Sequence, residues 1–216
     1  MAINIALDGP SAAGKSTIAK RLAKQLNYVH LDTGAMYRCV AYKALHTGVD
    51  LKDEAAVCKM IEETVIDMKS DGSIFLDGKL ISNEIRTDEI SMAASHVSAH
   101  KQVRALLVAQ QQKIAENKGY IMDGRDIGTV VLPHAELKVF MTASAEARAN
   151  RRHLENLSKG FESDLSQIIE EIRQRDWQDT HREHSPLKKA EDAVVLDTSD
   201  MSIDEVVKKI EELLPL

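Results

Sequence analysis

The residues best suited to chemistry lie near the start of the chain. Two residues after the apolar run 2–7, the segment from Gly9 to Ser16 reads G-x-x-x-x-G-K-S. Glycine permits backbone angles that let successive N–H groups point at one anion, Lys15 adds a positive charge, and Ser16 offers a hydroxyl oxygen to Mg²⁺. A helix that begins near Lys15 directs its unpaired N–H groups to the same place. The pattern predicts a loop that binds the phosphates of a nucleoside polyphosphate; a plain glycine-rich turn is the alternative. The loop consists of Gly9, Pro10, Ser11, Ala12, Ala13, Gly14, Lys15 and Ser16.

A second polar segment, Asp123-Gly124-Arg125-Asp126, follows the apolar residues 120–122. Ligands of open α/β sheets bind at the carboxyl ends of the strands, so two acids and an arginine at such an end are well placed for a site. Asp123 is suited to holding Mg²⁺ through water, as the second metal-facing acid of enzymes that carry this loop. We therefore expect Ser16 and Asp123 to face the metal. The alternative is a turn formed by the Asp-Gly pair.

Two groups of charged residues share helical spacings of three and four: Arg148, Arg151 and Arg152, and Arg175, Asp179 and Arg182. Each group can lie on one face of a helix. Taken alone, each is also typical of a solvated helix face with ion pairs along it. Phosphoryl transfer, however, needs fixed cations around the phosphate oxygens, and the planar fork of arginine binds phosphate through two hydrogen bonds. Together with the phosphate loop, the spacing favours a lid that carries arginines.

Apolar runs and turns along the chain predict strands that alternate with helices. Strands are expected at 2–7, 28–31, 120–122, 137–141 and 193–196, and helices from about 15, and at 35–46, 54–63, 88–97, 101–117, 144–153, 165–177 and 203–214. Residues 65–81 form shorter runs separated by turns at 70–72 and 77–78, which predicts a small antiparallel sheet. The alternation predicts an α/β fold with a mostly parallel sheet covered by helices on both faces.

Length and composition are those of a compact enzyme. The 216 residues suit one domain with a small insert, and a net charge of −6 argues against general binding of nucleic acid. The chain has no apolar stretch of about 18 residues and no basic-then-apolar signal pattern, so we expect a cytoplasmic protein without membrane contact. Cys39 and Cys58 are expected to be buried thiols.

Several motifs together resemble those of the bacterial cytidylate kinases over nearly the whole chain. They are 8–16, Asp32-Thr-Gly-Ala-Met-Tyr-Arg38, Ala-Ala-Ser at 93–95, Val103-Arg104, Asp-Gly-Arg-Asp-Ile-Gly-Thr at 123–129, and Arg-Asp-x-x-Asp-x-x-Arg at 175–182. The resemblance implies a P-loop nucleoside-monophosphate kinase core at 1–64 and 91–216. It also implies a monophosphate-binding insert at 65–90, a helical lid at 148–166, and the transfer of a phosphoryl group from ATP to CMP or dCMP.

The same resemblance assigns roles to individual residues. The ATP phosphates fall to Gly14, Lys15, Ser16 and Thr17; cytosine to Ser95, Arg104 and Asp126; the ribose to Arg175 and Asp179; and the acceptor phosphate to Arg38, Arg125 and Arg182. The lid arginines Arg148, Arg151 and Arg152 would close on the donor phosphates. Thr33 stands where other members carry serine and keeps the hydroxyl group. Catalysis would then rest on Lys15, Mg²⁺ and the arginines at 125, 148, 151, 152 and 182.

These assignments agree with the chemistry of cytosine. Its N4 amino group is a donor that an Asp126 oxygen can accept, whereas uracil would present oxygen to oxygen, at a cost that disfavours it roughly ten- to hundredfold. Kinases for UMP, AMP or shikimate remain alternatives with the same core. A guanine-nucleotide switch would need Asn-Lys-x-Asp, and the nearest stretch, 117–120, lacks the acid. The expected partners are small nucleotides, with no nucleic acid, and the chain is expected to be a monomer.

Overall fold

A computed structural model describes residues 2–69, 72–158 and 160–215. The chain divides into two compact units, Met1–Tyr28 with Gly119–Leu216, and Val29–Lys118. Strands alternate with helices along most of the chain, which confirms the predicted α/β class. Each unit is described by itself below.

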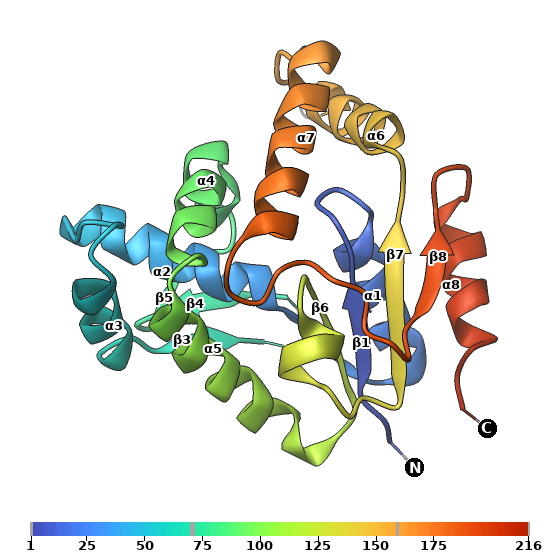
Figure 1. Ribbon diagram of the computed structural model, residues 1–216, viewed down its shortest axis with the longest axis horizontal. Helices are drawn as coiled ribbons and strands as arrows, with labels where there is room; N and C mark the ends of the chain where they lie inside the picture. Colours follow the sequence, from blue (N-terminus) through green and yellow to red (C-terminus); the bar gives the residue numbers. More distant parts are fainter. Residues whose placement is uncertain (1, 70–71, 159, 216) are drawn as a thin grey trace. The chain divides into compact units, whose positions relative to one another are not determined.

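The first unit contains four strands of a parallel sheet in the order β6-β1-β7-β8 (Figure 1). They are β1 (Ile5–Asp8), β6 (Tyr120–Gly124), β7 (Leu137–Thr142) and β8 (Val194–Asp197). All three pairings are parallel, as the sequence predicts, and the register sets Leu7 opposite both Asp123 and Val139. Because parallel strands end at the same edge, the residues that follow β1 and β6 meet there.

Helices α1 (Lys15–Leu26) and α8 (Ile203–Glu211) pack against one another beside this sheet. Their apolar faces form a core with the strands, as the 3.6-residue period of the sequence requires. The core includes Ile5, Leu7, Ile18, Leu22, Val139, Val206 and Ile210. A capping box begins α8: the Ser202 side chain accepts from the Glu205 N–H, while the Glu205 carboxylate accepts from the Ser202 N–H. A π-helical turn, η3 (Ile127–Val131), packs against β1.

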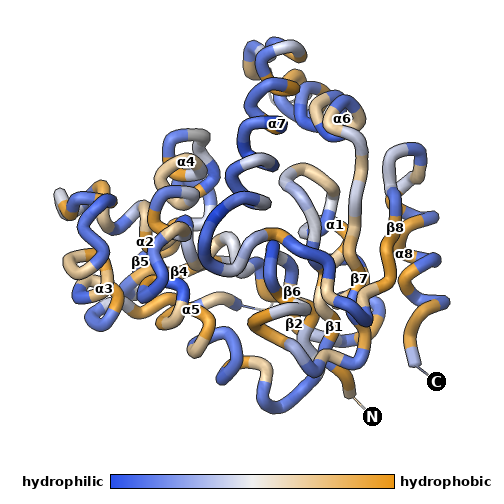
Figure 2. The backbone as a smooth tube through the Cα atoms, in the orientation of Figure 1, coloured by the Kyte–Doolittle hydropathy of each residue, from blue (hydrophilic) through white to orange (hydrophobic). Residues whose placement is uncertain are grey.

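Helices α6 (Ala145–Ser158) and α7 (Leu165–His181) pack on each other beyond the carboxyl end of β7 (Figure 1). Their contact is a small apolar cluster of Ala149, Ile168 and Ile172, and the remainder of α7 is largely hydrophilic (Figure 2). Both helices are longer than predicted. The helix expected to end at 153 runs to Ser158, and the one expected to end at 177 runs to His181.

The boundary of α7 was wrong because residues 178–181 are polar, so no apolar period marks this extension. The boundary of α6 was wrong although Leu154 and Leu157 continue an apolar spacing of three; both are exposed. The signal that ends α6 is a glycine. Gly160 adopts a φ of +79°, and the N–H groups of Gly160 and Phe161 donate to the carbonyls of Leu157 and Asn156 at 3.0 Å each. This is the hydrogen-bonding pattern of a left-handed C-cap.

The second unit contains a separate, smaller sheet within the range predicted for the insert. Strands β3 (Ile66–Met68), β4 (Ile74–Leu76) and β5 (Lys79–Leu80) are antiparallel, which confirms the small antiparallel sheet. Asp77 and Gly78 turn between β4 and β5 with φ values of +49° and +81°. The other turn expected, at 70–72, includes residues 70 and 71, which lie outside the described residues. The boundaries of the insert stay a prediction.

The remaining elements of the second unit are mostly helical. They are β2 (Val29–Asp32), α2 (Thr33–Thr47), α3 (Glu54–Glu62), η1 (Glu84–Arg86), α4 (Asp88–Val97), α5 (Lys101–Ile114) and η2 (Ala115–Asn117). Helix α2 packs on α4, and α3 packs on α5. Cys39 and Cys58 are free and buried, as expected. None of the described helices is long and apolar enough to cross a membrane.

Gly9 generates a prediction about stability. A Cβ atom at Gly9 would lie 2.0 Å from the carbonyl oxygen of Met141, and its φ is +147°. We expect Gly9→Ala to lower the free energy of unfolding by about 3 kcal/mol, from overpacking and backbone strain together. The measurement is urea unfolding followed by circular dichroism.

The matched control is Gly48→Ala, where φ is +72° but no atom lies within 4 Å of the added Cβ. It carries the backbone strain alone and should cost about 1 kcal/mol. Equal losses in the two variants would contradict the close approach of Gly9 to β7.

Candidate active site

The phosphate loop joins the end of β1 to the start of α1, as predicted. Gly14 precedes the helix in the left-handed region with a φ of +86°, and Ala12 also has a positive φ, +58°. The Lys15 ammonium group lies over this loop and donates to the carbonyl oxygens of Gly9, at 2.8 Å, and Pro10, at 2.7 Å. Lys15 is only 6% exposed. The loop therefore holds a buried cation against its own backbone.

Burial sets the electrostatics of this lysine. Burial, together with the nearby charge of Arg125, lowers the pKa of Lys15 to about 7, and the carboxylates of Asp123, Asp8 and Asp179 oppose the shift. A phosphate group beside Lys15 would supply the missing negative charge and raise this pKa again. The loop thus fits a polyphosphate.

Ser16 and Asp123 lie together, as predicted for the two residues that face the metal. The Ser16 hydroxyl donates to Asp123 Oδ2 at 2.7 Å, and Asp123 lies in β6 with 4% of its surface exposed. A hydroxyl and a carboxylate are hard oxygen ligands, which Mg²⁺ prefers. Among the described residues no group of three or more His, Cys, Asp or Glu side chains could hold a metal. The hydroxyl of Ser16 and the carboxylate of Asp123 would fit Mg²⁺ that takes its other ligands from nucleotide and water.

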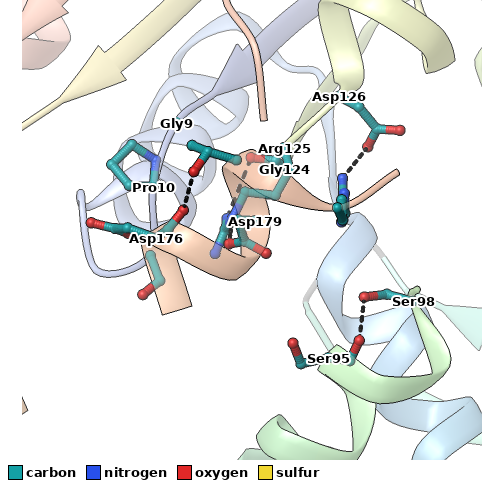
Figure 3. A network of polar contacts seen from close by, with 12 residues as sticks. Gly9, Pro10, Ser95, Ser98, Gly124, Arg125, Asp126, Asp176 and Asp179 are labelled. Carbon is teal, nitrogen blue, oxygen red and sulfur yellow. Dashed lines mark hydrogen bonds and ion pairs between the residues drawn. The ribbon is translucent and has the colours of Figure 1, made fainter. Parts of the chain in front are cut away.

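Four more of the predicted residues gather at the ends of β6 and α7. Arg125 Nε donates to Asp179 Oδ2 at 2.7 Å (Figure 3), and an Arg182 terminal nitrogen lies 3.9 Å from Asp126 Oδ1. Burial alone would raise the pKa of Asp179, but the charge and hydrogen bond of Arg125 outweigh it and hold that pKa below its usual value. The nearby charge of Arg175 acts in the same direction. The end of α7 is thereby tied to the strand that carries Asp123.

The lid arginines have different partners. Arg148, 4% exposed, donates to Ala143 O at 2.9 Å, to the loop carbonyl of Ser11 at 3.1 Å, and to both oxygens of Asp176 at 3.0 and 2.5 Å. Arg151 instead donates to the carbonyl oxygens of Thr198 and Ser199 after β8. Arg152 is half-buried. Of the three, Arg148 touches the phosphate loop, and the assignment of all three to donor phosphates stays a prediction.

The second unit holds the other predicted residues. Arg38 pairs with Asp32 at 2.7 Å, and the same carboxylate caps α2 by accepting from the Ala35 N–H at 3.0 Å. Arg104, 4% exposed, donates to Ser98 O at 3.2 Å and lies 5.4 Å from the centre of the Tyr37 ring.

Ser95 and Thr33 complete this group. The Ser98 hydroxyl donates to Ser95 O at 2.9 Å (Figure 3), and Thr33, 4% exposed, is the first residue of α2. Arg38, Thr33, Ser95 and Arg104 thus lie on α2, α4 and α5 of one unit.

Three acids with structural roles at the site were missed by sequence reasoning: Asp32 and Asp176, which each hold a predicted arginine, and Asp8, which binds main-chain N–H groups. Asp8 accepts from the Ile127 and Gly128 N–H groups, Asp32 pairs with Arg38, and Asp176 pairs with Arg148. All three lie inside the motifs that carried the resemblance. Their position beside the named arginines and the phosphate loop was the available signal.

A sequence model of the cytidylate kinase family matches residues 5–215 of this chain. The chain belongs to the cytidylate kinase family. Two relatives named cytidylate kinase, from Bacillus thuringiensis (strain Al Hakam) and Bacillus cereus (strain AH187), are each 53% identical over 211 residues, which cover 96% of this chain and 94% of theirs. A crystal structure of shikimate kinase from Bacteroides thetaiotaomicron has a TM-score of 0.53 at 13% identity and covers 100% of both chains. That likeness shows the shared kinase fold alone, and the motifs at the strand ends carry the family.

The depressed pKa of Lys15 predicts how stability depends on pH. Between the folded pKa of about 7 and the ordinary value of 10.5, the unfolded chain binds the additional proton, so stability rises with pH across this window. We expect this contribution, at most about 1.4 kcal/mol per pH unit, to be absent in Lys15→Met. Urea unfolding at several pH values without nucleotide measures it.

The control is Lys20→Met, at an exposed position on the same helix, which should keep the slope of the wild type. Parallel pH curves for the wild type and Lys15→Met would contradict a lysine that is costly to charge in the empty loop.

Proposed function

We propose that this chain transfers the γ-phosphoryl group of ATP to CMP or dCMP, giving ADP and CDP or dCDP. The observation that carries the proposal is the buried Lys15 on a phosphate loop beside Ser16 and Asp123, in a chain of the cytidylate kinase family. The acceptor follows from the family and from the name of the relatives. The donor follows from the loop, which suits a triphosphate.

The donor phosphates would lie in the loop, where Lys15 exchanges the carbonyls of Gly9 and Pro10 for phosphate oxygens. Ser16 and Asp123 would hold Mg²⁺, Asp123 through water, and the ion neutralises charge on the phosphates when bound. Arg148 is anchored at the same loop through Ser11 and would approach the donor from α6. These cations would already be in place before the reaction, so little reorganisation is needed as charge develops.

The acceptor needs no general base. Its attacking oxygen is already an anion, so the work of the protein is to offset the repulsion between two phosphates and to align them. Arg125 and Arg182 from the first unit and Arg38 from the second would bind the acceptor phosphate, while Arg175 and Asp179 would bind the ribose. Asp126, Ser95 and Arg104 would read the edge of cytosine.

A coupled ADP-release assay with CMP, dCMP, UMP, AMP and no acceptor tests this function. We expect turnover with CMP or dCMP, at least tenfold weaker use of UMP, and a rate near zero without acceptor.

Lys15→Met should lower kcat by a factor of about 10³, because it removes a charge aimed at the transferring phosphate. Near-normal turnover by the folded variant would overturn the role of Lys15, and preference for another acceptor would overturn the function.

Asp126→Ala should weaken discrimination more than it weakens donor binding. Removing the carboxylate that accepts from the cytosine amino group should reduce the ratio of kcat/KM for CMP over UMP by about ten- to hundredfold. The KM for ATP should change by less than about threefold. Asp200→Ala, at an exposed acid before α8, is the control. Equal losses for every acceptor would count against reading of the base by Asp126.

A further inference from the structure

Asp8 is a buried acid at the end of β1 to which the function above gives no role. It is 4% exposed, and its two carboxylate oxygens accept from the consecutive N–H groups of Ile127 and Gly128, each at 2.7 Å. These two residues open the π-helical turn η3, whose first N–H groups have no partner within the turn. The carboxylate therefore binds the start of η3 as a fork.

This fork fixes the main chain on one side of Asp126. The Asp126 carbonyl accepts from the N–H groups of Val130, at 2.9 Å, and Val131, at 3.2 Å. The N–H groups of the two residues that follow Asp126 are held by Asp8. With its carbonyl and the next two amides all bonded, Asp126 has little freedom to turn, and its φ of −139° with a ψ of 28° lies outside regular helix or strand.

The contact between Asp8 and the start of η3 is closely packed. A Cβ atom at Gly128 would lie 3.3 Å from Asp8 Oδ2 and 3.1 Å from Lys138 Cδ. The Lys138 ammonium group is itself anchored, at 2.6 Å from Pro133 O and at 2.8 and 2.9 Å from the Asp192 oxygens. The turn after Asp126 is thus held between the carboxylate of Asp8 and the stem of Lys138.

We propose that Asp8 is a positioning residue for the acceptor: by holding the amides of Ile127 and Gly128, it aims the Asp126 side chain and so sets the selectivity for cytosine over uracil. The proposal rests on the proposed function. It gives one strand two tasks, because β1 leads into the phosphate loop at Gly9 and its last side chain supports the turn that reads the base.

Because Asp8 can be protonated, its effect on the acceptor should depend on pH, which gives the proposal a second test. Burial raises the pKa of Asp8 to about 6; the two amide bonds and Lys15 oppose the shift, and the charge of Asp126 adds to it. Below that pH the carboxyl group is protonated and one oxygen is no longer a free acceptor. Lys15 and Asp126 are the charged side chains that act on Asp8, whereas the Lys138 ammonium group is bound to Pro133 and Asp192. The pH dependence that comes from the titration of Asp8 should be absent in its amide variant.

The test is Asp8→Asn, which keeps the shape but sets an NH₂ group against a backbone N–H. We expect the KM for CMP to rise about tenfold and the ratio of kcat/KM for CMP over UMP to fall about tenfold. The KM for ATP should rise less than the KM for CMP, and by some amount because the Asp8 charge also acts on Lys15. The matched control is Asp53→Asn, since Asp53 accepts from the Ala56 N–H at 3.0 Å at the start of α3. That variant should keep all three values.

The pH profile separates positioning from mere stability. The advantage of the wild type over Asp8→Asn in kcat/KM for CMP should shrink toward one as the pH falls from about 7.5 to about 5.5. The phosphate of the substrate titrates in the same range but equally for both proteins, so it cancels in this ratio. If Asp8→Asn fails to fold, Gly128→Ala serves instead, because its Cβ would displace the same contact and should lower the CMP over UMP ratio.

The outcomes are distinct. If the wild type does not phosphorylate CMP, the proposed function fails whatever Asp8 does. If the wild type phosphorylates CMP, but Asp8→Asn lowers only stability or scales CMP and UMP equally, the positioning role is overturned while the function stands.

Discussion

The bond between the Lys15 ammonium group and the carbonyls of its own loop is the interaction on which the rest of this structure depends. Burying an ammonium group costs free energy unless hydrogen bonds and opposite charges offset it. The carbonyls of Gly9 and Pro10 supply the bonds, and Asp8 and Asp123 supply charge. Both acids are there because of the strand register, in which Leu7 lies opposite Asp123 and Asp8 opposite Gly124. The register of the parallel sheet thus places the negative charges of these two acids beside the phosphate loop.

Several of the predicted arginines are each paired with an acid. Arg125 pairs with Asp179, Arg148 with Asp176, and, in the second unit, Arg38 with Asp32. Such pairs keep the guanidinium groups fixed and charged without a ligand, which is the preorganisation that phosphoryl transfer requires. They are also weak evidence for stability, because desolvation offsets much of the attraction between buried charges. The main effect of these pairs is to hold the guanidinium groups in fixed positions.

The sequence was sufficient for the residues whose chemistry is local. Patterns within a few residues are enough for the glycines and Lys15 of the phosphate loop, for the strand that carries Asp123, and for the cap of Ser202 on α8. The partners of the arginines could not be predicted, because they depend on the register between α6 and α7 and on where each helix ends. The length of α7 was underestimated because residues 178–181 are polar, and that of α6 although the exposed Leu154 and Leu157 continue its apolar spacing. Asp8 was visible as part of a motif, but its partners lie about 120 residues away in the chain.

The likeness to shikimate kinase, at 13% identity, concerns the sheet and its helices alone. Under the proposed function, selection of the acceptor would lie in residues at the strand ends and in the contacts that hold them in place. A carboxylate that reads a base is effective only if it cannot swing to accept from water or from another donor, because discrimination rests on leaving the wrong base unpaired. In this chain, hydrogen bonds to the main chain at and after Asp126 limit how its side chain can turn. The turn after Asp126 is bonded to the end of β1 and packed on Lys138. In the proposed role of Asp126, its orientation would be set by the same strand that opens the phosphate loop.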